Sequence, residues 1–222
     1  MDRFGYSKTM DKATYQRNKD NILKEYKFIV PCMNTDKICV FTNLGLMHQI
    51  KVLDIPAGKF RDKGVPIDNL CNYDSAKEYI IQVLDAHTMI HSTLLFATAK
   101  SMLKVMDGDL LNASKRTVQA TKLSEDELVA VIVADWSEES EDKVVLQTKD
   151  GVFLKFPYAE IPKKKKSALG VRGMKLSKDD LITNVYVMDA QNISSIMYKE
   201  KELEFNRLKL SKRDTKGTKV RR

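Results

Sequence analysis

The sequence predicts an all-β repeat protein, and three features of its 222 residues support that class. Runs rich in branched and aromatic residues alternate with turn residues along most of the chain, as in the strands of a sheet. Two such runs, in residues 144–156, are joined by Asp150-Gly151, a pair that accepts the backbone of a tight hairpin turn. A hairpin, an Ile-Pro pair, a basic loop and a returning strand recur with a period of about fifty residues, as in propellers and solenoids.

The repeat is clearest when residues 38–64 are aligned with residues 144–170. In both copies nineteen residues separate a hairpin glycine from a second glycine beyond the basic loop. A unit of this length cannot bury its apolar face alone, so successive units must pack together in a single repeat domain. The matched residues are Thr42 with Thr148, Gly45 with Gly151, Ile55-Pro56 with Ile161-Pro162, and Gly64 with Gly170.

Taken in order, the chain opens on residues 2–8, which have the composition of a hairpin tip whose first strand is missing. Residues 9–27 are polar without a sustained period, so we expect a long loop or a frayed turn of helix. An acidic segment at residues 137–142 is expected to be a solvated turn. Branched and aromatic content predicts strands in residues 28–33, 38–41, 46–53, 79–85 and 129–136, and weaker copies of the repeat in residues 94–123 and 196–220.

The net charge of +8 is distributed unevenly. Residues 1–162 carry 21 Lys and Arg against 23 Asp and Glu, whereas residues 163–222 carry 17 against 7. This asymmetry indicates a surface for a polyanion, and nucleic acid is favoured over acidic lipid because no amphipathic helix or apolar anchor accompanies the cations. The alternative, that the lysines only keep the surface soluble, stays open at this stage.

Targeting signals and cysteine usage indicate a cytoplasmic protein. No stretch approaches the roughly eighteen apolar residues of a membrane helix, and the first residues lack the apolar segment of a signal peptide. Cys32, Cys39 and Cys71 are odd in number and lie in or next to strand-like segments. We therefore expect them to be reduced core residues rather than a disulfide framework.

No catalytic or metal-binding constellation can be assembled from the sequence. His87 and His91 lack the glutamate that a zinc protease places beside its first histidine, and their context favours a strand. Cys32 and Cys39 have no second pair for a zinc ribbon. Residues 170–173 have neither the length nor the lysine and hydroxyl residue of a phosphate-binding loop. The sequence thus predicts no active site, no metal and no cofactor in this chain.

The repeated motifs resemble a known family. Hairpins ending in Thr-x-x-Gly, followed by Ile-Pro, a basic stretch, and residues 63–67 or 170–176, are similar to the C-terminal domain of the A subunit of bacterial type IIA topoisomerases, DNA gyrase and topoisomerase IV. The resemblance covers essentially the whole chain and implies a β-pinwheel of about five four-stranded blades, the first incomplete. The expected blades are residues 1–26 (partial), 27–77, 78–127, 128–181 and 182–222 of one repeat domain.

The resemblance implies that a basic outer surface bends double-stranded DNA without reading its sequence. Family DNA contacts transfer onto basic residues of the loops, together with two cations near the N-terminus. These residues are Arg17, Lys19, Lys59, Arg61, Lys63, Lys115, Arg116, Lys163, Lys164, Lys165, Lys166, Arg172, Lys175, Lys212, Arg213, Lys216 and Lys219.

Two departures from the family pattern shape the functional expectation. The gyrase A subunit typically carries a Gln-Arg-Arg-Gly-Gly-Lys-Gly box, and residues 16–22 match it at only the first two positions. Without those glycines a topoisomerase IV-like domain that bends DNA is favoured, and a gyrase domain that wraps DNA for negative supercoiling is the alternative. The resemblance also implies that the catalytic breakage-reunion domain lies outside these residues, so Tyr15 is not expected to be its tyrosine.

The resemblance further implies partners outside this chain. The B subunit, together with the catalytic part of the A subunit, would complete an ATP-dependent holoenzyme that uses Mg²⁺, inside the bacterial cytoplasm near the nucleoid, while the isolated domain would be monomeric. Two rival classes stay open: a propeller-like protein-interaction scaffold for acidic partners, and a hydrolase that needs inward-facing carboxylates or histidines.

Overall fold

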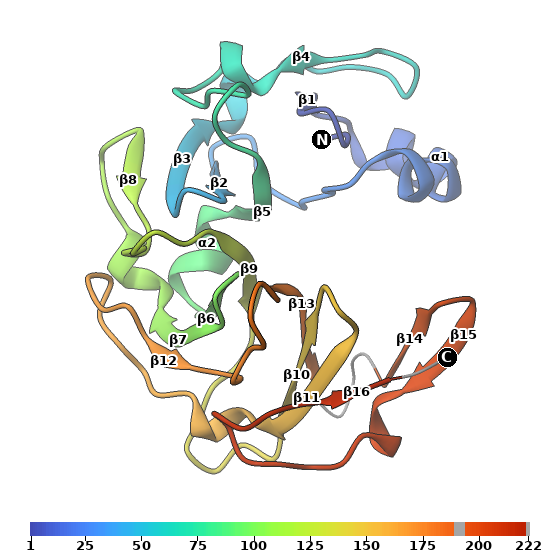
Figure 1. Ribbon diagram of the computed structural model, residues 1–222. Coiled ribbons are helices and arrows are strands. Elements are labelled where there is room, and N and C mark those ends of the chain that lie inside the picture. The colour runs from blue at the N-terminus through green and yellow to red at the C-terminus, as the bar shows by residue number, and fades with distance from the viewer. Residues whose placement is uncertain (189–193, 221–222) are drawn as a thin grey trace. The chain divides into compact units, whose positions relative to one another are not determined.

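The computed structural model describes residues 1–188 and 194–220, and its elements confirm the all-β prediction (Figure 1). The chain divides into two compact units. Unit 1 comprises Met1–His91 and Leu111–Ala120, and unit 2 comprises Ser92–Leu110 and Thr121–Arg222. The prediction of a single repeat domain and of its blade bounds stays a prediction. Arg221 and Arg222, at the end of the last predicted blade, lie outside the described residues.

Unit 1 contains a four-stranded antiparallel sheet around the hairpin β2–β3, with Gly45 in its turn at φ +71°. Apolar residues of this sheet pack with Ile55, Ile67 and Cys71 into a core cluster. A two-stranded ribbon joins β1 (Tyr6–Ser7) to β4 (Val65–Pro66). In spatial order the larger sheet is β5 (Ile80–Asp85), β2 (Lys37–Thr42), β3 (Leu46–Lys51) and β8 (Thr117–Gln119).

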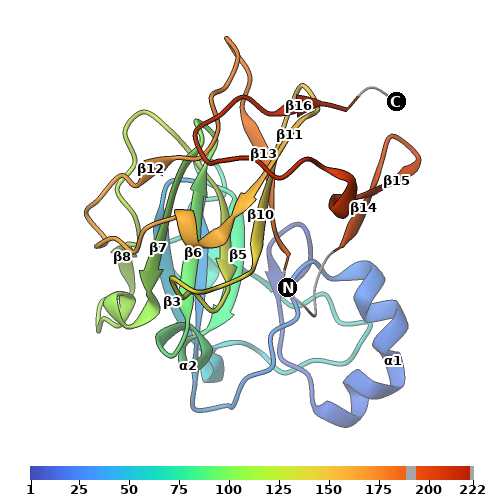
Figure 2. The same ribbon diagram turned by 90° about the horizontal axis from the view of Figure 1, so that it is seen from below.

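Unit 2 contains two further sheets of the same design and a two-stranded ribbon (Figure 2). A large apolar cluster joins strands of both sheets, with Phe156, Tyr158 and Ile161 fully buried. The hairpin predicted at Asp150-Gly151 is confirmed, and only Gly151 has a positive φ. One sheet is β12 (Val171–Arg172), β7 (Met102–Asp107), β6 (Thr93–Thr98) and β9 (Leu128–Val133); the other is β13 (Ile182–Met188), β10 (Lys143–Thr148), β11 (Val152–Pro157) and β16 (Thr218–Lys219); the ribbon is β14 (Ser195–Tyr198) and β15 (Lys201–Glu204).

The fourth strand of each sheet is supplied by the next repeat along the chain. After a hairpin, the chain makes a 3-10 turn, passes through a basic loop and forms a short strand. This strand pairs with a strand of the preceding repeat: β4 with β1, β8 with β3, β12 with β7, and β16 with β11. This exchange places every basic loop against a strand of the preceding repeat. The 3-10 turns that follow hairpins are η1 (Val52–Asp54), η3 (Gly108–Leu111), η4 (Tyr158–Glu160) and η5 (Phe205–Arg207), whereas η2 (Ile67–Asn69) follows β4.

Several local predictions were wrong. Residues 9–27, expected as a long loop or a frayed turn of helix, contain a regular helix, α1 (Lys12–Glu25), whose N-cap Asp11 accepts a hydrogen bond from the Thr14 amide. Residues 28–33 form no strand. His87 lies in a short helix, α2 (Ala86–Ile90), because Asp85 caps it, so the strand expected there is absent. Among the described residues, neither helix is long and apolar enough to cross a membrane.

The cysteine prediction was correct for two residues and wrong for the third. All three thiols are free, with Cys39 and Cys71 buried and Cys32 exposed. Burial raises the pKa of Cys39 to about 12 and that of Cys71 to about 11. Cys32 is exposed because residues 28–33 run outside the sheet instead of forming a strand.

Candidate nucleic-acid interface

The predicted basic residues lie mostly on the loops that lead from a 3-10 turn to an exchanged strand. Four such loops are described: residues 55–64 and 112–116 in unit 1, and residues 161–170 and 208–217 in unit 2. A loop of this kind has few hydrogen bonds of its own, so its shape depends on the donors that a strand of the preceding repeat offers to its carbonyl groups.

The lysine run lies in the loop of residues 161–170. The side chains of Lys163, Lys164 and Lys165 are exposed, and Lys166 is half-buried. The loop begins beside β7, where the Val105 amide donates to the Pro162 carbonyl (3.3 Å) and the Lys164 amide donates to the Val105 carbonyl (2.8 Å). The backbone is therefore fixed at the point where the cationic side chains start.

A fifth lysine, Lys104 of β7, points into this loop and is only 1% exposed. Its Nζ donates to the carbonyl oxygens of Lys165 (3.4 Å), Lys166 (2.8 Å) and Ala168 (2.8 Å). It also lies over the Phe96 ring, 5.9 Å from the centroid. Burial lowers the pKa of Lys104 to about 8. At neutral pH it is still an ammonium, whose three donors match three acceptors.

The four lysines of the run are not equivalent in their surroundings. Lys163 forms an ion pair with Asp107 (2.6 Å), and its Nζ lies 5.7 Å from the centroid of the Trp136 ring. Within the described residues, Lys164 and Lys165 form no ion pair, so their charge is available to an outside anion. Another cation, Lys122, lies close by, since its amide donates to the Lys166 carbonyl (3.4 Å).

A second basic cluster in unit 2 forms where residues 171–175 lie beside the loop of residues 208–217. Met174 and Thr215 form a parallel bridge, and the Lys175 amide donates to the Thr215 carbonyl (3.0 Å). This bridge brings Arg172 and Lys175 together with Lys212, Arg213 and Lys216, whereas Lys219 lies in β16.

The two arginines of this cluster are engaged within the protein. Arg172 makes a two-point contact with Asp214 (2.5 and 3.1 Å), which lowers the pKa of that carboxyl group. The Arg213 guanidinium donates to the carbonyl oxygens of Glu160 (3.1 Å) and Arg172 (2.5 Å), and its amide donates to the Glu160 carboxylate (2.7 Å). Arg213 is thus a structural residue as much as a surface charge.

In unit 1, the loop of residues 55–64 exposes Lys59, Arg61 and Lys63. Lys8 holds its backbone, because its Nζ donates to the carbonyl oxygens of Lys59 (2.7 Å), Phe60 (2.6 Å) and Asp62 (2.5 Å). Lys63 lies over the Tyr6 ring, 4.3 Å from the centroid.

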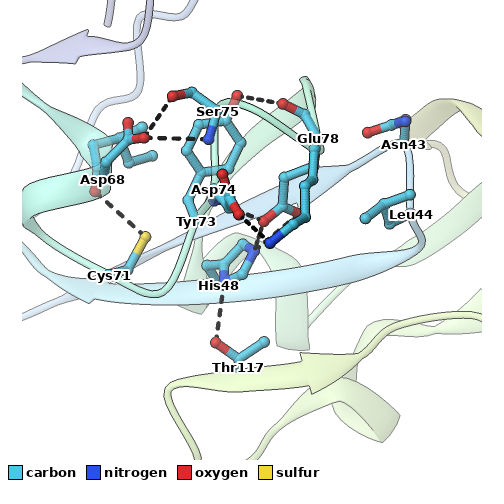
Figure 3. Close-up of polar contacts among 12 residues, drawn as sticks. Asn43, Leu44, His48, Asp68, Cys71, Tyr73, Asp74, Ser75, Glu78 and Thr117 are labelled. Carbon is cyan, nitrogen blue, oxygen red and sulfur yellow. Dashed lines mark hydrogen bonds and ion pairs between the residues drawn. The ribbon is translucent and has the colours of Figure 1, made fainter.

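The other unit 1 loop carries exposed Lys115 and Arg116 and is held without a lysine. The Gln49 side-chain amide donates to the carbonyl oxygens of Ala113 (2.8 Å) and Lys115 (2.7 Å). Next to it, as Figure 3 shows, the His48 ring lies between Thr117 and Glu78.

The His48 ring is held on both sides. Its Nδ1 is 3.0 Å from Thr117 Oγ1, and its Nε2 is 3.2 Å from each carboxylate oxygen of Glu78. The Glu78 carboxylate also accepts from the Asp74 amide (3.0 Å). A hydroxyl, an imidazole and a carboxylate in this order have the composition of a catalytic triad, but the side chains of His48 and Glu78 are 1% and 3% exposed. No substrate can reach an imidazole buried in this way, so the contact is structural.

The remaining predicted residues lie on α1, where Arg17 and Lys19 are both exposed. The structure therefore separates the predicted residues into groups within each unit: one on α1, one on each unit 1 loop, and two in unit 2. His87 and His91, which the sequence already excluded as a metal site, have their ring centroids 4.6 Å apart. Among the described residues no group of three or more potential metal-binding side chains is found.

Sequence reasoning missed the inward-pointing lysines Lys8, Lys104 and Lys155, because only the charge of the loops was counted. The spacing offers no signal for them, because Lys8 and Lys104 follow Gly5 and Ser101 by three residues, as His48 follows Gly45. Lys155 is 8% exposed and donates to the carbonyl oxygens of Phe205 (2.9 Å) and Asn206 (3.3 Å).

A known protein family matches the sequence of this chain. The family described as "DNA gyrase C-terminal domain, beta-propeller" matches three segments, residues 36–75, 92–135 and 142–187. Each matched segment contains one of the three hairpins of the four-stranded sheets.

Curated relatives of this chain are A subunits of DNA gyrase. The A subunit of DNA gyrase from Chlamydia pneumoniae is 31% identical over 159 residues, which are 69% of this chain and 18% of that protein. The A subunit of DNA gyrase from Lawsonia intracellularis is 27% identical over 213 residues, 89% of this chain and 25% of that protein. The chain thus spans about a fifth to a quarter of the length of these relatives.

Solved structures show the same fold. The C-terminal domain of DNA topoisomerase IV superimposes with a TM-score of 0.81 at 20% identity, covering 98% of this chain and 70% of that one. The DNA gyrase A C-terminal domain superimposes with a TM-score of 0.62 at 21% identity, covering 85% and 61%. The β-pinwheel fold expected from the sequence is confirmed by these neighbours.

Proposed function

This chain belongs to the DNA gyrase C-terminal domain family, as the C-terminal domain of a type IIA topoisomerase A subunit, and we propose that it binds and bends duplex DNA without reading base sequence. Its part in the parent enzyme would be to present DNA to a catalytic core and a B subunit in the bacterial cytoplasm. ATP and Mg²⁺ would be used there, by parts of the holoenzyme outside this chain.

The observation that carries the proposal is the loop of residues 161–170. Its carbonyl groups face inward onto Lys104, while Lys164 and Lys165 are exposed and form no ion pair within the described residues. Exposed lysines on a loop of this kind are suited to phosphate contacts, which carry no sequence information. Sequence-independent binding is therefore favoured.

The first experiment replaces Lys164 and Lys165 with alanine and measures duplex affinity as a function of salt. Each lost phosphate contact should lower the slope of log K against log salt by about 0.9. The matched control is Lys100→Ala with Lys149→Ala, which removes the same charge from two exposed hairpin turns of the same unit. Equal losses in both variants would mean that only net charge counts, and no loss in either would contradict the proposal.

The same titration distinguishes DNA from the rival partner. A scaffold that binds acidic proteins would show a shallow salt slope, because a protein partner releases few condensed counterions. Competition between unrelated duplexes of equal length tests the second half of the proposal. Near-equal affinities are expected, and about a hundredfold preference for one sequence would require base contacts.

We favour bending over full wrapping because of α1. The stretch that takes the place of the glycine-rich box, residues 16–22, lies inside this helix, so its amides are used in helical hydrogen bonds and cannot approach phosphates as a glycine loop would. Bending a site of 20 to 30 base pairs costs on the order of 1 to 6 kcal/mol, which requires contacts at several points. A topoisomerase IV-like role follows from this reading.

Ligase closure of nicked circles with saturating protein tests the choice between the two roles. Bending without a chiral wrap leaves the linking number almost unchanged. A positive shift that grows with protein concentration would instead support a gyrase-type wrapping domain, which the names of the curated relatives suggest.

A further inference from the structure

Two lysines in different units make the same set of contacts with a basic loop. Lys8 donates to the carbonyls of Lys59, Phe60 and Asp62, and Lys104 donates to those of Lys165, Lys166 and Ala168. In each loop these acceptors lie five, four and two residues before a glycine, Gly64 or Gly170. Agreement at every position shows that the two contacts are copies of one structural device.

The glycine is part of the device. Gly64 and Gly170 have φ angles of +80° and +98°, and a Cβ at either position would collide with the carbonyl oxygen of the residue before the lysine, Ser7 or Leu103. A positive φ at this point allows the carbonyl two residues earlier to face the ammonium while the next residue enters the exchanged strand.

The loop contacts its host strand on both sides of the lysine. In unit 2, Leu103 pairs with Val171 in the antiparallel exchanged strand, and Val105 forms a parallel bridge with Lys163. In unit 1 the corresponding contacts are Ser7 with Val65 and Thr9 with Ala57. The ammonium thus lies at the centre of a loop whose two ends are fixed by backbone pairing.

The arrangement requires a cation. Three carbonyl oxygens converge on one point, and three N–H donors of an ammonium satisfy them together. A neutral apolar side chain of similar length would leave these carbonyls without their donor. The loop would then open so that the carbonyls reach water, and the side chains that follow them would lose their fixed direction.

We propose that Lys104 is a positioning residue for DNA binding, whose buried ammonium fixes the loop so that Lys164 and Lys165 stay directed outward, and that Lys8 does the same for Lys59 and Arg61. This inference rests on the proposed DNA-binding function. It separates the cations of each loop into two classes: outer ones that contact phosphate and an inner one that never does.

The test compares Lys104→Met with Lys155→Met. Both remove a buried ammonium bonded to carbonyls in unit 2, but Lys155 contacts the η5 turn and not the lysine run. Hydrogen exchange without DNA should be about tenfold faster at the amides of Lys164 and Ala168 in Lys104→Met, because charged hydrogen bonds are lost there. Lys155→Met should leave these amides unchanged.

DNA affinity supplies the second readout. Positioning predicts that Lys104→Met weakens binding by about threefold or more, since free side chains must be ordered again, at an unchanged salt slope. A reduced slope would mean that Lys104 itself contacts phosphate, and would overturn the inference. Faster exchange with unchanged affinity would also overturn it, because the device would then be purely structural.

Lys8→Met keeps the inference testable if Lys104→Met does not fold. Lys8 is half-buried, and the amides of Lys59 and Asp62 report on its loop. Unchanged exchange at these amides would overturn the inference irrespective of DNA. If the wild-type chain and the variants all failed to bind DNA while exchange responded, the proposed function would have failed and the loop-fixing contact would stand without a role in binding.

Discussion

The loop of residues 161–170 and the loop of residues 112–116 occupy equivalent places in their repeats but are closed by different chemistry. Lys104 and His48 both lie three residues after a hairpin residue of positive φ, Ser101 and Gly45. In the loop of residues 112–116, which has no such lysine, the Gln49 side-chain amide donates to carbonyls four and two residues before Thr117. Lys104 likewise donates to carbonyls four and two residues before Gly170.

The backbone differs together with the donor. Gly170 and Gly64 have positive φ angles, whereas Thr117, at the same position, does not. The loop of residues 208–217 agrees with this pattern. Leu154 stands there at the position equivalent to Lys104, and Gly217, at the position equivalent to Gly170, lacks a positive φ. A glycine of positive φ therefore accompanies the lysine ammonium in both loops, because that turn directs three carbonyls at one point.

The largest expected effect comes from replacing that glycine. Gly170→Val places a β-branched residue at φ +98° and against the Leu103 carbonyl, so we expect the free energy of unfolding to fall by about 1 to 3 kcal/mol or more. Urea denaturation measures the change. Thr117→Gly is the matched control in the other loop, and its loss should be limited to about one hydrogen bond, near 1 kcal/mol. Equal losses would remove the distinction between the two kinds of loop.

The next effect concerns the loop that lacks a lysine. Glu78→Ala removes the partner of His48 Nε2 and the acceptor of the Asp74 amide, leaving two buried or half-buried groups unpaired. A loss of about 1 to 3 kcal/mol is expected in urea denaturation. Asp68→Ala is the control, since its bonds to Ser75 are exposed, and a loss as large as that of Glu78→Ala would show that burial is not what makes the His48 contact matter.

A pH titration gives a smaller effect with a definite sign. The pKa of Lys104 is lowered to about 8 in the folded chain, so between pH 8 and its ordinary value near 10.5 the unfolded chain binds more protons. The free energy of unfolding should therefore rise with pH in this window for the wild type relative to Lys104→Met. The groups packed around the ammonium are the Phe96 ring, the loop bearing Lys165 and Lys166, and the segment bearing Lys122.

DNA affinity should change in the opposite direction over the same window, because deprotonated Lys104 has one donor fewer for the loop. The Gln49 amide does not titrate, so the loop of residues 112–116 should show no such step in hydrogen exchange after correction for intrinsic rates. A wild-type stability curve parallel to that of Lys104→Met would contradict the predicted sign.

The smallest effect is expected at the Arg172–Asp214 pair. Asp214→Asn keeps a side chain that tolerates the positive φ of 61° at this position, so thermal stability should barely change for an exposed ion pair. Arg172 is released from its partner and becomes available to phosphate. Duplex affinity should rise slightly, with a salt slope steeper by up to about 0.9, and a decrease in affinity would show that Asp214 orients Arg172 toward DNA.

Much of this architecture could be predicted from local patterns. The hairpin at residues 144–156 was found because Asp150-Gly151 separates two apolar runs, and the repeat was found because the glycine spacing is the same in two copies. Helix α1 was expected as no more than a loop or a frayed turn, because it buries only Ile22 and has no apolar stripe, although Asp11 is a favourable N-cap residue.

The inner lysines could not be predicted by counting charge. Lys104 and Lys164 have the same formal charge in the sequence, and only the three-dimensional path of the loop places one inside and the other outside. Likewise, the contacts of Lys163 with Asp107 and of Arg172 with Asp214 join residues that are far apart in the chain. Which cations are available to a ligand is therefore a property of the fold.

Each four-stranded sheet takes its fourth strand from the next repeat, and this exchange determines where the chain can be cut into separate repeats. A cut placed between two complete hairpins would leave β3, β7 or β11 with an open edge, and open edges pair with other chains. A unit that can be duplicated or deleted without leaving an open edge must therefore start inside one sheet and end inside the next. Its boundaries do not coincide with the boundaries of the sheets. Gain or loss of a repeat in this architecture consequently alters two neighbouring sheets at once.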